Sequence, residues 1–147
     1  LIGDAAHAIV PFFGQGMNAS FEDCEVLMDY IDECNGNWQA IFTTFNEKRK
    51  PDTDAIAKMA IENYIEMRDL VTQPDYILHK KIANALFAKF PDNFIPRYNM
   101  VSFTSIPYSE VYARGKIQHG IISELDANNI DYEKAEQLIS ERLASIS

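Results

Sequence analysis

Two short glycine segments near the start of the chain combine residue types that can hold an anion. Gly3-Asp4 is the first, and Gly14-Gln15-Gly16 is the second, placed directly before an amphipathic stretch. Glycine lets a ligand approach the backbone closely. A helix that begins after such a loop points free N–H groups and a partial positive charge at whatever lies there. The spacing predicts an anion site whose donors are the backbone N–H groups of Met17 and Asn18.

A plainer interpretation of the first segment stays open. Asp is a favoured N-cap residue, so Gly3-Asp4 before Ala5-Ala6-His7 is also the pattern of a simple turn and helix cap. The second glycine segment favours the ligand site, because it stands directly before a helix in the same part of the chain.

No other residue pattern indicates catalysis or metal binding. His7 stands in a tight turn beside a helix, where a histidine is more often structural than a base. His79 and His119 are isolated, and no acids at metal-ligand spacing accompany them. Cys24 and Cys34 form no CxxC pair or zinc spacing, and Cys24 is expected to be a small buried hydrophobe. We therefore expect no catalytic side chain and no metal site in this chain.

The two glycine segments must be positioned by helices, which the spacing of apolar residues predicts. After Asn18, apolar residues recur at steps of three and four, at Phe21, Cys24, Leu27, Met28 and Ile31. The acidic pair Glu22-Asp23 between them is expected to be solvated. Asn35-Gly36-Asn37 then predicts a turn. A short second stripe follows, at Trp38, Ile41, Phe42 and Phe45.

Two prolines are expected to open further helices, because proline suits the first helical turn. The helix after Pro51 has its inward residues at Ile56, Met59, Ala60, Asn63, Met67 and Leu70. Asn63 is polar, and a buried amide needs a polar partner. That partner is either a ligand or a backbone group. The helix after Pro74 faces inward with Ile82, Leu86 and Phe90.

The helical pattern is interrupted in two places. Pro91 and Pro96 predict an irregular loop over residues 91–107, with a short extended piece at Met100–Thr104. Leu1-Ile2 is typical of the last residues of a buried strand. These two segments are the only strand that we expect.

Two more helices are expected at the C-terminal end. The first runs from about residue 109 to 122 and the second from about 131 to 143. The inward face of the second helix is formed by Ala135, Leu138, Ile139 and Leu143. Together with the earlier helices, this spacing predicts a mainly α chain with little strand.

Composition argues against some classes of partner. The chain has 147 residues, a formal net charge of −9 and 47% hydrophobic residues. Such acidity argues against nucleic acid and against anionic membrane surfaces. No apolar run approaches the ~18 residues that a membrane span needs. The presence of only two cysteines, without a signal peptide, indicates a reducing, cytoplasmic setting.

The opening motifs resemble the second flavin motif of the FAD-dependent aromatic hydroxylases. The resemblance is carried by Gly3-Asp4-Ala5-Ala6-His7, Pro11 and Gly14-Gln15-Gly16-Met17-Asn18. It implies that Asp4 hydrogen-bonds a ribityl hydroxyl of FAD. It also implies that the helix start faces the pyrimidine end of the flavin ring. The implied cofactor-binding residues are Gly3, Asp4, Pro11, Gly14, Gly16, Met17 and Asn18.

Within that family, the chain is similar to the members that hydroxylate L-kynurenine. The similarity extends from residue 1 to about residue 112, and it rests on the segments 11–18, 50–52, 63–68 and 94–101. It implies that Asn63, Met67 and Tyr98 contact the substrate, and that Phe12 lies near the substrate ring at the flavin. On spacing alone Met67 is core filler, and the backbone alternative for Asn63 remains.

The resemblance also implies how the longer protein works. NADPH and O₂ are used with FAD to convert L-kynurenine to 3-hydroxykynurenine. The chain lacks the Gly-x-Gly-x-x-Gly motif with which this family holds its dinucleotide, and it does not begin with Met. We therefore expect the C-terminal portion of an α/β flavoprotein monooxygenase. Its partner is then the missing N-terminal half, and the chain alone is expected to be inactive.

This interpretation divides the chain into two functional parts. Residues 1–35 are expected to end the FAD-binding domain, and residues 36–147 are expected to form a helical region that covers the substrate. Eukaryotic relatives carry a C-terminal membrane helix, whereas this chain resembles the soluble bacterial form.

Two other interpretations stay open. A related FAD-dependent aromatic hydroxylase with another substrate shares the flavin motif, so only Asn63, Met67 and Tyr98 separate it from the first interpretation. A non-catalytic helical interaction module that kept a decayed motif is the second alternative.

Overall fold

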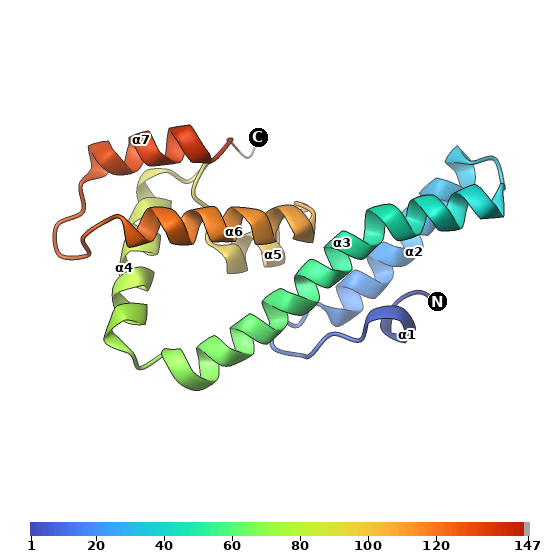
Figure 1. Ribbon diagram of the computed structural model, residues 1–147, viewed down its shortest axis with the longest axis horizontal. Coiled ribbons are helices and arrows are strands. Elements are labelled where there is room, and N and C mark those ends of the chain that lie inside the picture. Colours follow the sequence, from blue (N-terminus) through green and yellow to red (C-terminus); the bar gives the residue numbers. More distant parts are fainter. Residues whose placement is uncertain (146–147) are drawn as a thin grey trace. The chain divides into compact units, whose positions relative to one another are not determined.

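The computed structural model describes residues 1–145, which contain helices and no strand (Figure 1). In chain order, the elements are α1 (Asp4–His7), α2 (Gly16–Glu33), α3 (Trp38–Ile65), the π-helix η1 (Glu66–Leu70), α4 (Pro74–Lys89), α5 (Arg97–Phe103), α6 (Tyr108–Ser123) and α7 (Tyr132–Arg142). The mainly α prediction is confirmed. No helix in this part of the chain is long and apolar enough to cross a membrane.

The chain forms two compact units, and each is described by itself. The first unit comprises Leu1–Ile65 and Pro107–Ser109. The second comprises Glu66–Ile106 and Glu110–Ser147. Residue 35, where the sequence suggested a functional boundary, lies between α2 and α3 inside the first unit.

The first unit is built on the helical hairpin of α2 and α3, which lie side by side (Figure 1). The connecting turn uses the left-handed region, with φ of 48° at Asn35 and 73° at Gly36. The Gly36 N–H donates to the Ile31 carbonyl at 3.1 Å, which satisfies a carbonyl at the helix end. The predicted turn is confirmed.

The prediction that Pro51 opens a new helix was wrong. Residues 38–65 form one helix of 28 residues with Pro51 inside it. A proline in a helix removes one backbone hydrogen bond and disfavours the preceding turn. Buried residues on both sides of it, including Ile41 and Ile56, fasten the helix to the rest of the unit. Tertiary packing therefore keeps α3 continuous through a residue that usually begins or ends a helix.

The face that α2 buries also differs from the prediction. Its buried residues are Ala19 and Asp23. Of the predicted apolar face, Leu27 and Ile31 are half-buried, whereas Phe21 is 66% and Met28 58% exposed. Cys24, expected to be buried, is exposed as well. Asp23 faces inward toward charged and polar partners, and Phe21, Cys24 and Met28 face outward.

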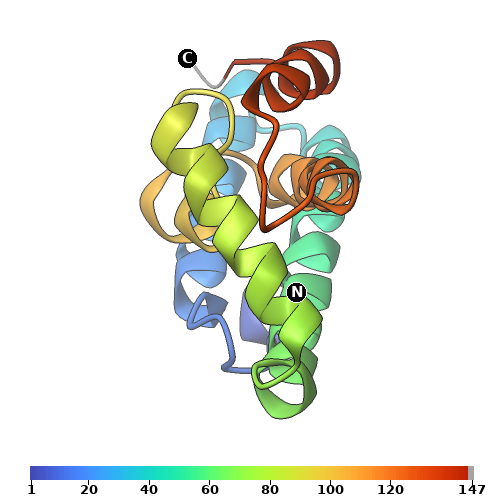
Figure 2. The same ribbon diagram turned by 90° about the vertical axis from the view of Figure 1, so that its left-hand side faces the viewer.

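The second unit has its core between α4, α6 and α7. Figure 1 shows α6 crossing α4 steeply, and Figure 2 shows α6 almost end-on behind α4. The core residues are Ile82, Leu86, Phe94, Ile121, Ile122, Ala127, Ala135, Leu138, Ile139 and Leu143. The inward faces predicted for α4 and α7 are therefore confirmed, except that Phe90 is only partly buried at the end of α4.

Two buried polar side chains of α6 hold the irregular segment before α5. The Arg114 guanidinium donates to the Asn93 carbonyl at 3.1 Å and to the Ala144 carbonyl at 2.8 Å. The Gln118 amide donates to the Ile95 carbonyl at 2.8 Å. These bonds satisfy backbone carbonyls that no helix satisfies, and so they fix a loop that the prolines keep out of helical structure.

Neither of the predicted extended pieces forms in the described residues. Residues 97–103 form α5 instead, and the Met100 N–H donates to the Pro96 carbonyl at 3.0 Å. Leu1 is 99% exposed and outside any strand. A strand needs a partner strand for its hydrogen bonds, whereas a helix satisfies its own backbone groups.

Candidate functional site

The first glycine segment forms a tight turn that leads into the four-residue helix α1. Gly3 is its N-cap, with φ of 60° and ψ of −148°, a conformation that other residues rarely adopt. Its carbonyl accepts from the N–H groups of Ala6 and His7 at 2.8 and 3.0 Å. A Cβ placed on Gly3 would lie 3.3 Å from the Cβ and Oγ atoms of Ser20. Gly3 is therefore needed for its conformation and for its close approach to α2.

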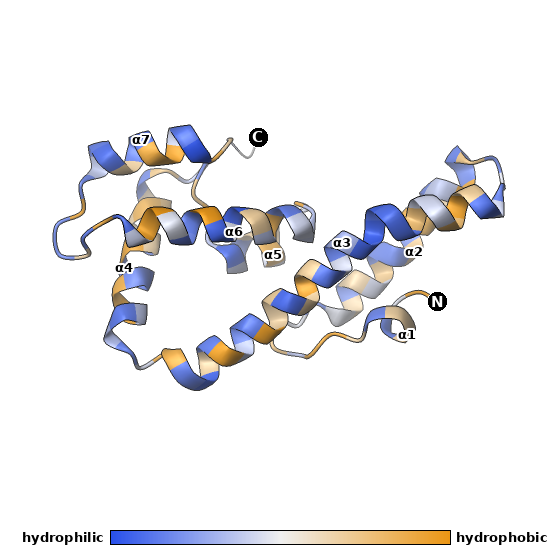
Figure 3. Ribbon diagram, in the orientation of Figure 1, coloured by the Kyte–Doolittle hydropathy of each residue, from blue (hydrophilic) through white to orange (hydrophobic). Residues whose placement is uncertain are grey.

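The second glycine segment ends a mostly apolar loop, coloured orange in Figure 3, and begins α2. Gly14 has φ of 70°. Gln15 is the N-cap of α2, but its side chain does not bond the helix backbone. Instead, its Oε1 accepts from Asn18 Nδ2 at 2.8 Å. The first turn of α2 therefore has no side-chain cap, as the predicted donor role of the Met17 and Asn18 N–H groups requires.

The structure brings the two glycine segments together. A Cβ placed on Gly16 would lie 3.9 Å from Asp4 Oδ1 and 3.9 Å from the Ile9 carbonyl oxygen. The exposed Asp4 carboxylate thus lies beside the first residue of α2. The site offers an acceptor for a hydroxyl group next to donors for negative charge. That combination fits the contacts with ribityl and flavin that the resemblance implies. Pro11 lies exposed in the loop between the segments.

Phe12 is the predicted substrate-contacting residue that this loop carries. The Asn63 Nδ2 atom donates to the Phe12 carbonyl at 2.6 Å. The rings of Phe12 and Tyr64 have centroids 4.4 Å apart. The structure thus brings Phe12 together with Asn63, at the end of α3. Of the two partners considered for Asn63, a ligand or a backbone group, the structure shows the backbone group. Contact of Asn63 with a substrate stays a prediction.

The other two predicted substrate residues lie in the second unit. Met67 is 55% exposed on η1, and Tyr98 is 54% exposed on α5. Their neighbours Glu66 and Arg97 form an ion pair with a distance of 2.8 Å between Glu66 Oε1 and an Arg97 guanidinium nitrogen. This pair joins the two segments, and no pattern in the sequence indicated it.

The segment that carries Met67 has a helical form common at functional sites. The Val71 N–H donates to the Glu66 carbonyl at 3.2 Å, which is the i→i+5 bond of a π-helix. Such short π-helical insertions are rare in helices and frequent where proteins bind ligands. Whether Met67 and Tyr98 meet a substrate stays a prediction.

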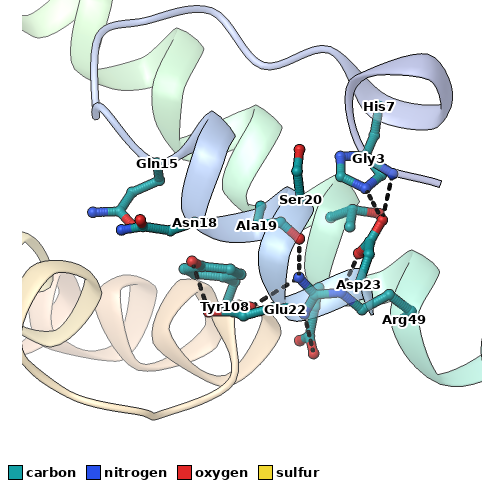
Figure 4. Close-up of polar contacts among 12 residues, drawn as sticks. Gly3, His7, Gln15, Asn18, Ala19, Ser20, Glu22, Asp23, Arg49 and Tyr108 are labelled. Carbon is teal, nitrogen blue, oxygen red and sulfur yellow. Dashed lines mark hydrogen bonds and ion pairs between the residues drawn. The ribbon is translucent and has the colours of Figure 1, made fainter. Parts of the chain in front are cut away.

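A buried network of charged groups lies behind the Gly3-Asp4 turn (Figure 4). Asp23 is 1% exposed and accepts from the Gly3 N–H at 2.8 Å and Arg49 Nε at 2.7 Å. His7 Nε2 lies 2.6 Å from Asp23 Oδ2. The expectation that Asp23 is solvated was wrong, because these three groups replace water around its carboxylate. His7 has a structural contact, as its position in a tight turn indicated.

Electrostatics keep this carboxylate charged. Burial raises the pKa of Asp23, but hydrogen bonds from Arg49, Gly3 and His7 outweigh burial, so that the pKa lies below its ordinary value of 3.8. An ionised carboxylate can only accept. His7 Nε2 is therefore the donor in its contact with Asp23.

Arg49 extends the network to α2 and to the start of α6. Its guanidinium donates to the Ala19 carbonyl at 2.9 Å and to Glu22 Oε2 at 2.8 Å. Burial lowers the pKa of Arg49, but its bonds to Asp23 and Glu22 outweigh burial and raise that pKa overall. Burial and the neighbouring Glu22 raise the pKa of Tyr108, and the Tyr108 hydroxyl donates to Glu22 Oε1 at 3.1 Å. The carboxylates of Asp23 and Glu22 are thus both paired with Arg49.

The sequence contained one signal for this network. Arg49 precedes Thr53, Ile56 and Ala60 at helical steps of four, three and four, on the buried face of α3. An arginine in line with such a stripe is rarely buried unless a partner accompanies it. The stripe therefore indicated a buried acid elsewhere in the chain, but not which one.

Comparisons with known proteins show what this chain is similar to. Residues 1–60 match the family described as FAD binding domain. The chain is 47% identical to a kynurenine 3-monooxygenase of Myxococcus xanthus (strain DK1622), over 97% of this chain and 32% of that protein. It is 40% identical to a kynurenine 3-monooxygenase of Legionella pneumophila (strain Corby), over 95% of this chain and 32% of that protein.

A third relative is more similar over a shorter span. The chain is 50% identical to a kynurenine 3-monooxygenase of Cytophaga hutchinsonii, over 86% of this chain and 28% of that protein. The chain therefore spans about a third of the length of the curated relatives that it matches. The resemblance inferred from the motifs is confirmed.

Proposed function

The first 60 residues of this chain belong to the FAD binding domain family, and the chain is a relative of the kynurenine 3-monooxygenases; from this premise we propose that it is part of a flavin-dependent monooxygenase. The intact protein hydroxylates L-kynurenine to 3-hydroxykynurenine with NADPH and O₂. The chain supplies one wall of the FAD site and part of the substrate site.

One observation carries this proposal: the Asp4 carboxylate lies beside the uncapped start of α2. A ribityl hydroxyl can donate to Asp4. The N–H groups of Met17 and Asn18 can face the flavin ring, where a helix N-terminus stabilises negative charge. Gly3 and Gly14 allow the two turns that bring these groups together, since both have positive φ. When bound, FAD supplies the electron transfer and the oxygen chemistry.

The protein's own task at the substrate is to orient it and keep water away. In this proposal Phe12 and Met67 pack against the aromatic ring, while Asn63 and Tyr98 make polar contacts. No side chain of this segment is needed as an acid or base. Excluding water protects reactive intermediates from side reactions.

The partner in this proposal is the remainder of a longer polypeptide. Two observations support it: the curated relatives are about three times as long as the chain, and α2 exposes an apolar stripe at Met17, Phe21, Cys24 and Met28. Large exposed apolar patches mark surfaces that another segment of the protein, or another molecule, covers. On this basis, the chain alone has no turnover. A cytoplasmic location belongs to the same proposal, because both cysteines are free thiols.

The test is made on the intact protein that contains this chain. Its absorption spectrum is recorded, and NADPH oxidation is followed with and without L-kynurenine. We expect flavin bands, faster NADPH oxidation with L-kynurenine, and 3-hydroxykynurenine as the product. Flavin bands without stimulation of NADPH oxidation by L-kynurenine would mean that the substrate is another aromatic compound. A protein without flavin would remove the proposal, and a helical interaction module would then be the better description.

A further inference from the structure

The short helix α1 has no buried side chains of its own to fix its position. It has four residues, none of which is buried. A helix of this length is not stable by itself, so contacts with neighbouring elements must fix its orientation. Asp4, the proposed ribityl contact, is the first residue of this helix, and its direction depends on those contacts.

Asp23 fastens both ends of this turn. Its carboxylate accepts from the N–H of Gly3, directly before Asp4, and from the ring of His7, the last residue of α1. Figure 4 shows both partners on the same carboxylate oxygen, while the other oxygen faces Arg49. Since the two contacts bracket Asp4, the position of the Asp23 carboxylate determines where the turn lies.

The same network also reaches the start of α2. Asp23 lies seven residues after Gly16, roughly 10 Å along the helix, so Asp23 does not itself belong to the α2 N-terminus. Arg49, which holds Asp23, also donates to the carbonyl of Ala19 in the first turns of α2 at 2.9 Å. One buried pair therefore links the turn that carries the acceptor with the helix that carries the donors.

We propose that Asp23 is a positioning residue for the flavin site, acting through Gly3 and His7 to hold Asp4 against the start of α2. Its partner Arg49 fixes the carboxylate from the opposite side. This inference rests on the proposed function and deepens it, because it identifies a residue remote from the ligand that determines how tightly the intact protein holds FAD.

His7 offers the sharper variant, since its side chain lies at the edge of the network. His7→Ala removes the donor to Asp23. His7→Gln keeps an N–H donor close to the place of the ring Nε2 and serves as the conservative rescue. Asp23→Asn keeps the shape of the side chain but removes the charge that three donors share.

Two control variants separate positioning from general stability. Glu22→Gln changes the neighbouring acid, which bonds Arg49 and Tyr108 and is not bonded to the turn. Ile56→Val removes one methylene from a fully buried side chain and lowers stability without touching the network.

The measurement is the dissociation constant of FAD, from quenching of flavin fluorescence on titration with the intact apoprotein. The melting temperature of each apoprotein is recorded beside it. We expect His7→Ala and Asp23→Asn to raise the dissociation constant about tenfold or more. His7→Gln recovers most of the affinity lost by His7→Ala. Glu22→Gln and Ile56→Val stay within about twofold of the wild type, although Ile56→Val melts earlier.

Three results would overturn the inference. His7→Ala and Asp23→Asn could leave the FAD affinity unchanged. His7→Gln could bind FAD as weakly as His7→Ala. Ile56→Val could weaken FAD binding in proportion to its lower melting temperature. If Asp23→Asn does not fold, the comparison of the two His7 variants decides. A wild-type protein that binds no FAD would remove the proposed function and this inference with it.

Discussion

Asp4 and Asn63 illustrate how different two predicted contact residues are at the scale of single side chains. Asp4 is exposed at a turn, beside the start of α2. Asn63 already donates to the Phe12 carbonyl at 2.6 Å. The loss of the Asp4 side chain removes an acceptor from the flavin site, whereas the loss of the Asn63 side chain removes one hydrogen bond to the Phe12 backbone.

We expect the two alanine variants to separate cofactor binding from substrate binding. In the intact protein, Asp4→Ala should weaken FAD binding by about 1.5–3 kcal/mol, because a charged hydrogen bond is lost. Asn63→Ala should weaken L-kynurenine binding and leave bound FAD unchanged. Flavin content and substrate titration measure the two effects. Full flavin occupancy in Asp4→Ala, or flavin release from Asn63→Ala, would contradict these roles.

Arg49 and Lys50 are adjacent cations with different environments. The Arg49 side chain is 7% exposed and paired with Asp23, whereas that of Lys50 is 61% exposed and paired with Asp54. We expect Arg49→Met to cost about 3–5 kcal/mol in the free energy of unfolding, because the buried Asp23 carboxylate loses its guanidinium partner. Lys50→Met should cost about 1 kcal/mol or less. Urea unfolding of both variants measures this difference, and equal losses would contradict it.

The lowered pKa of Asp23 predicts how stability changes in acid. A carboxylate with a lower pKa in the folded state stabilises that state fully above its unfolded pKa, near the ordinary value of 3.8. This stabilisation is lost as the pH falls further, through the folded pKa. Asp23→Asn should therefore be less stable than the wild type at neutral pH, with a difference that shrinks below about pH 4. Urea unfolding at several pH values tests this, and a constant difference would contradict it.

At the scale of elements, continuity of α3 is decided by packing and not by local preference. Pro51 lies inside this helix, while Pro74 opens α4 and Pro96 is the N-cap of α5. Proline thus stands at the start of α4 and α5 but in the middle of α3. The difference is that α3 has residues buried against the rest of the first unit on both sides of its proline.

The start of α7 follows local rules closely. Asp131 is its N-cap, and Asp131 Oδ1 accepts from the Lys134 N–H at 3.0 Å. We expect Asp131→Ala to lower the free energy of unfolding by about 1 kcal/mol, because a first-turn N–H loses its acceptor. Asp131→Asn keeps the cap and should change stability by only about a few tenths of a kcal/mol. Thermal melting compares the two variants. If both melt alike, the cap is not what stabilises the start of α7.

At the scale of the whole molecule, the outward apolar stripe of α2 matters most. Phe21 is 66% and Met28 58% exposed in the chain, and Cys24 lies between them, also exposed. The chain spans about a third of its curated relatives. In the proposed longer protein, another part of the polypeptide covers this stripe.

Cys24 makes that expectation measurable. In the intact protein with Cys34→Ser, we expect Cys24 to react with a thiol reagent about tenfold or more slowly under native conditions than in denaturant, because burial blocks access to the thiolate. The reaction of Cys34 in the variant Cys24→Ser serves as the comparison. A Cys24 that reacts equally fast with and without denaturant would mean that the stripe is exposed in the intact protein too.

Local features were determined by the sequence alone. The apolar spacing predicted α4 and α7, and the glycine segments predicted the turn before α1 and the start of α2. These features depend on residues close together in the chain, since helical periodicity and glycine conformation are local properties. The flavin motif belongs to the same class, because its two glycine segments lie within the first 16 residues.

The tertiary structure decided whatever depends on distant partners. Asp23 is buried because Arg49, 26 residues away, meets it. With Asp23 facing inward, Phe21, Cys24 and Met28 lie on the outside of α2. Asn63 finds its partner 51 residues away, at Phe12. The spacing of apolar residues gives the face of a helix but not the element that it meets. A charged residue whose partner lies on another helix therefore becomes visible only when the chain is folded.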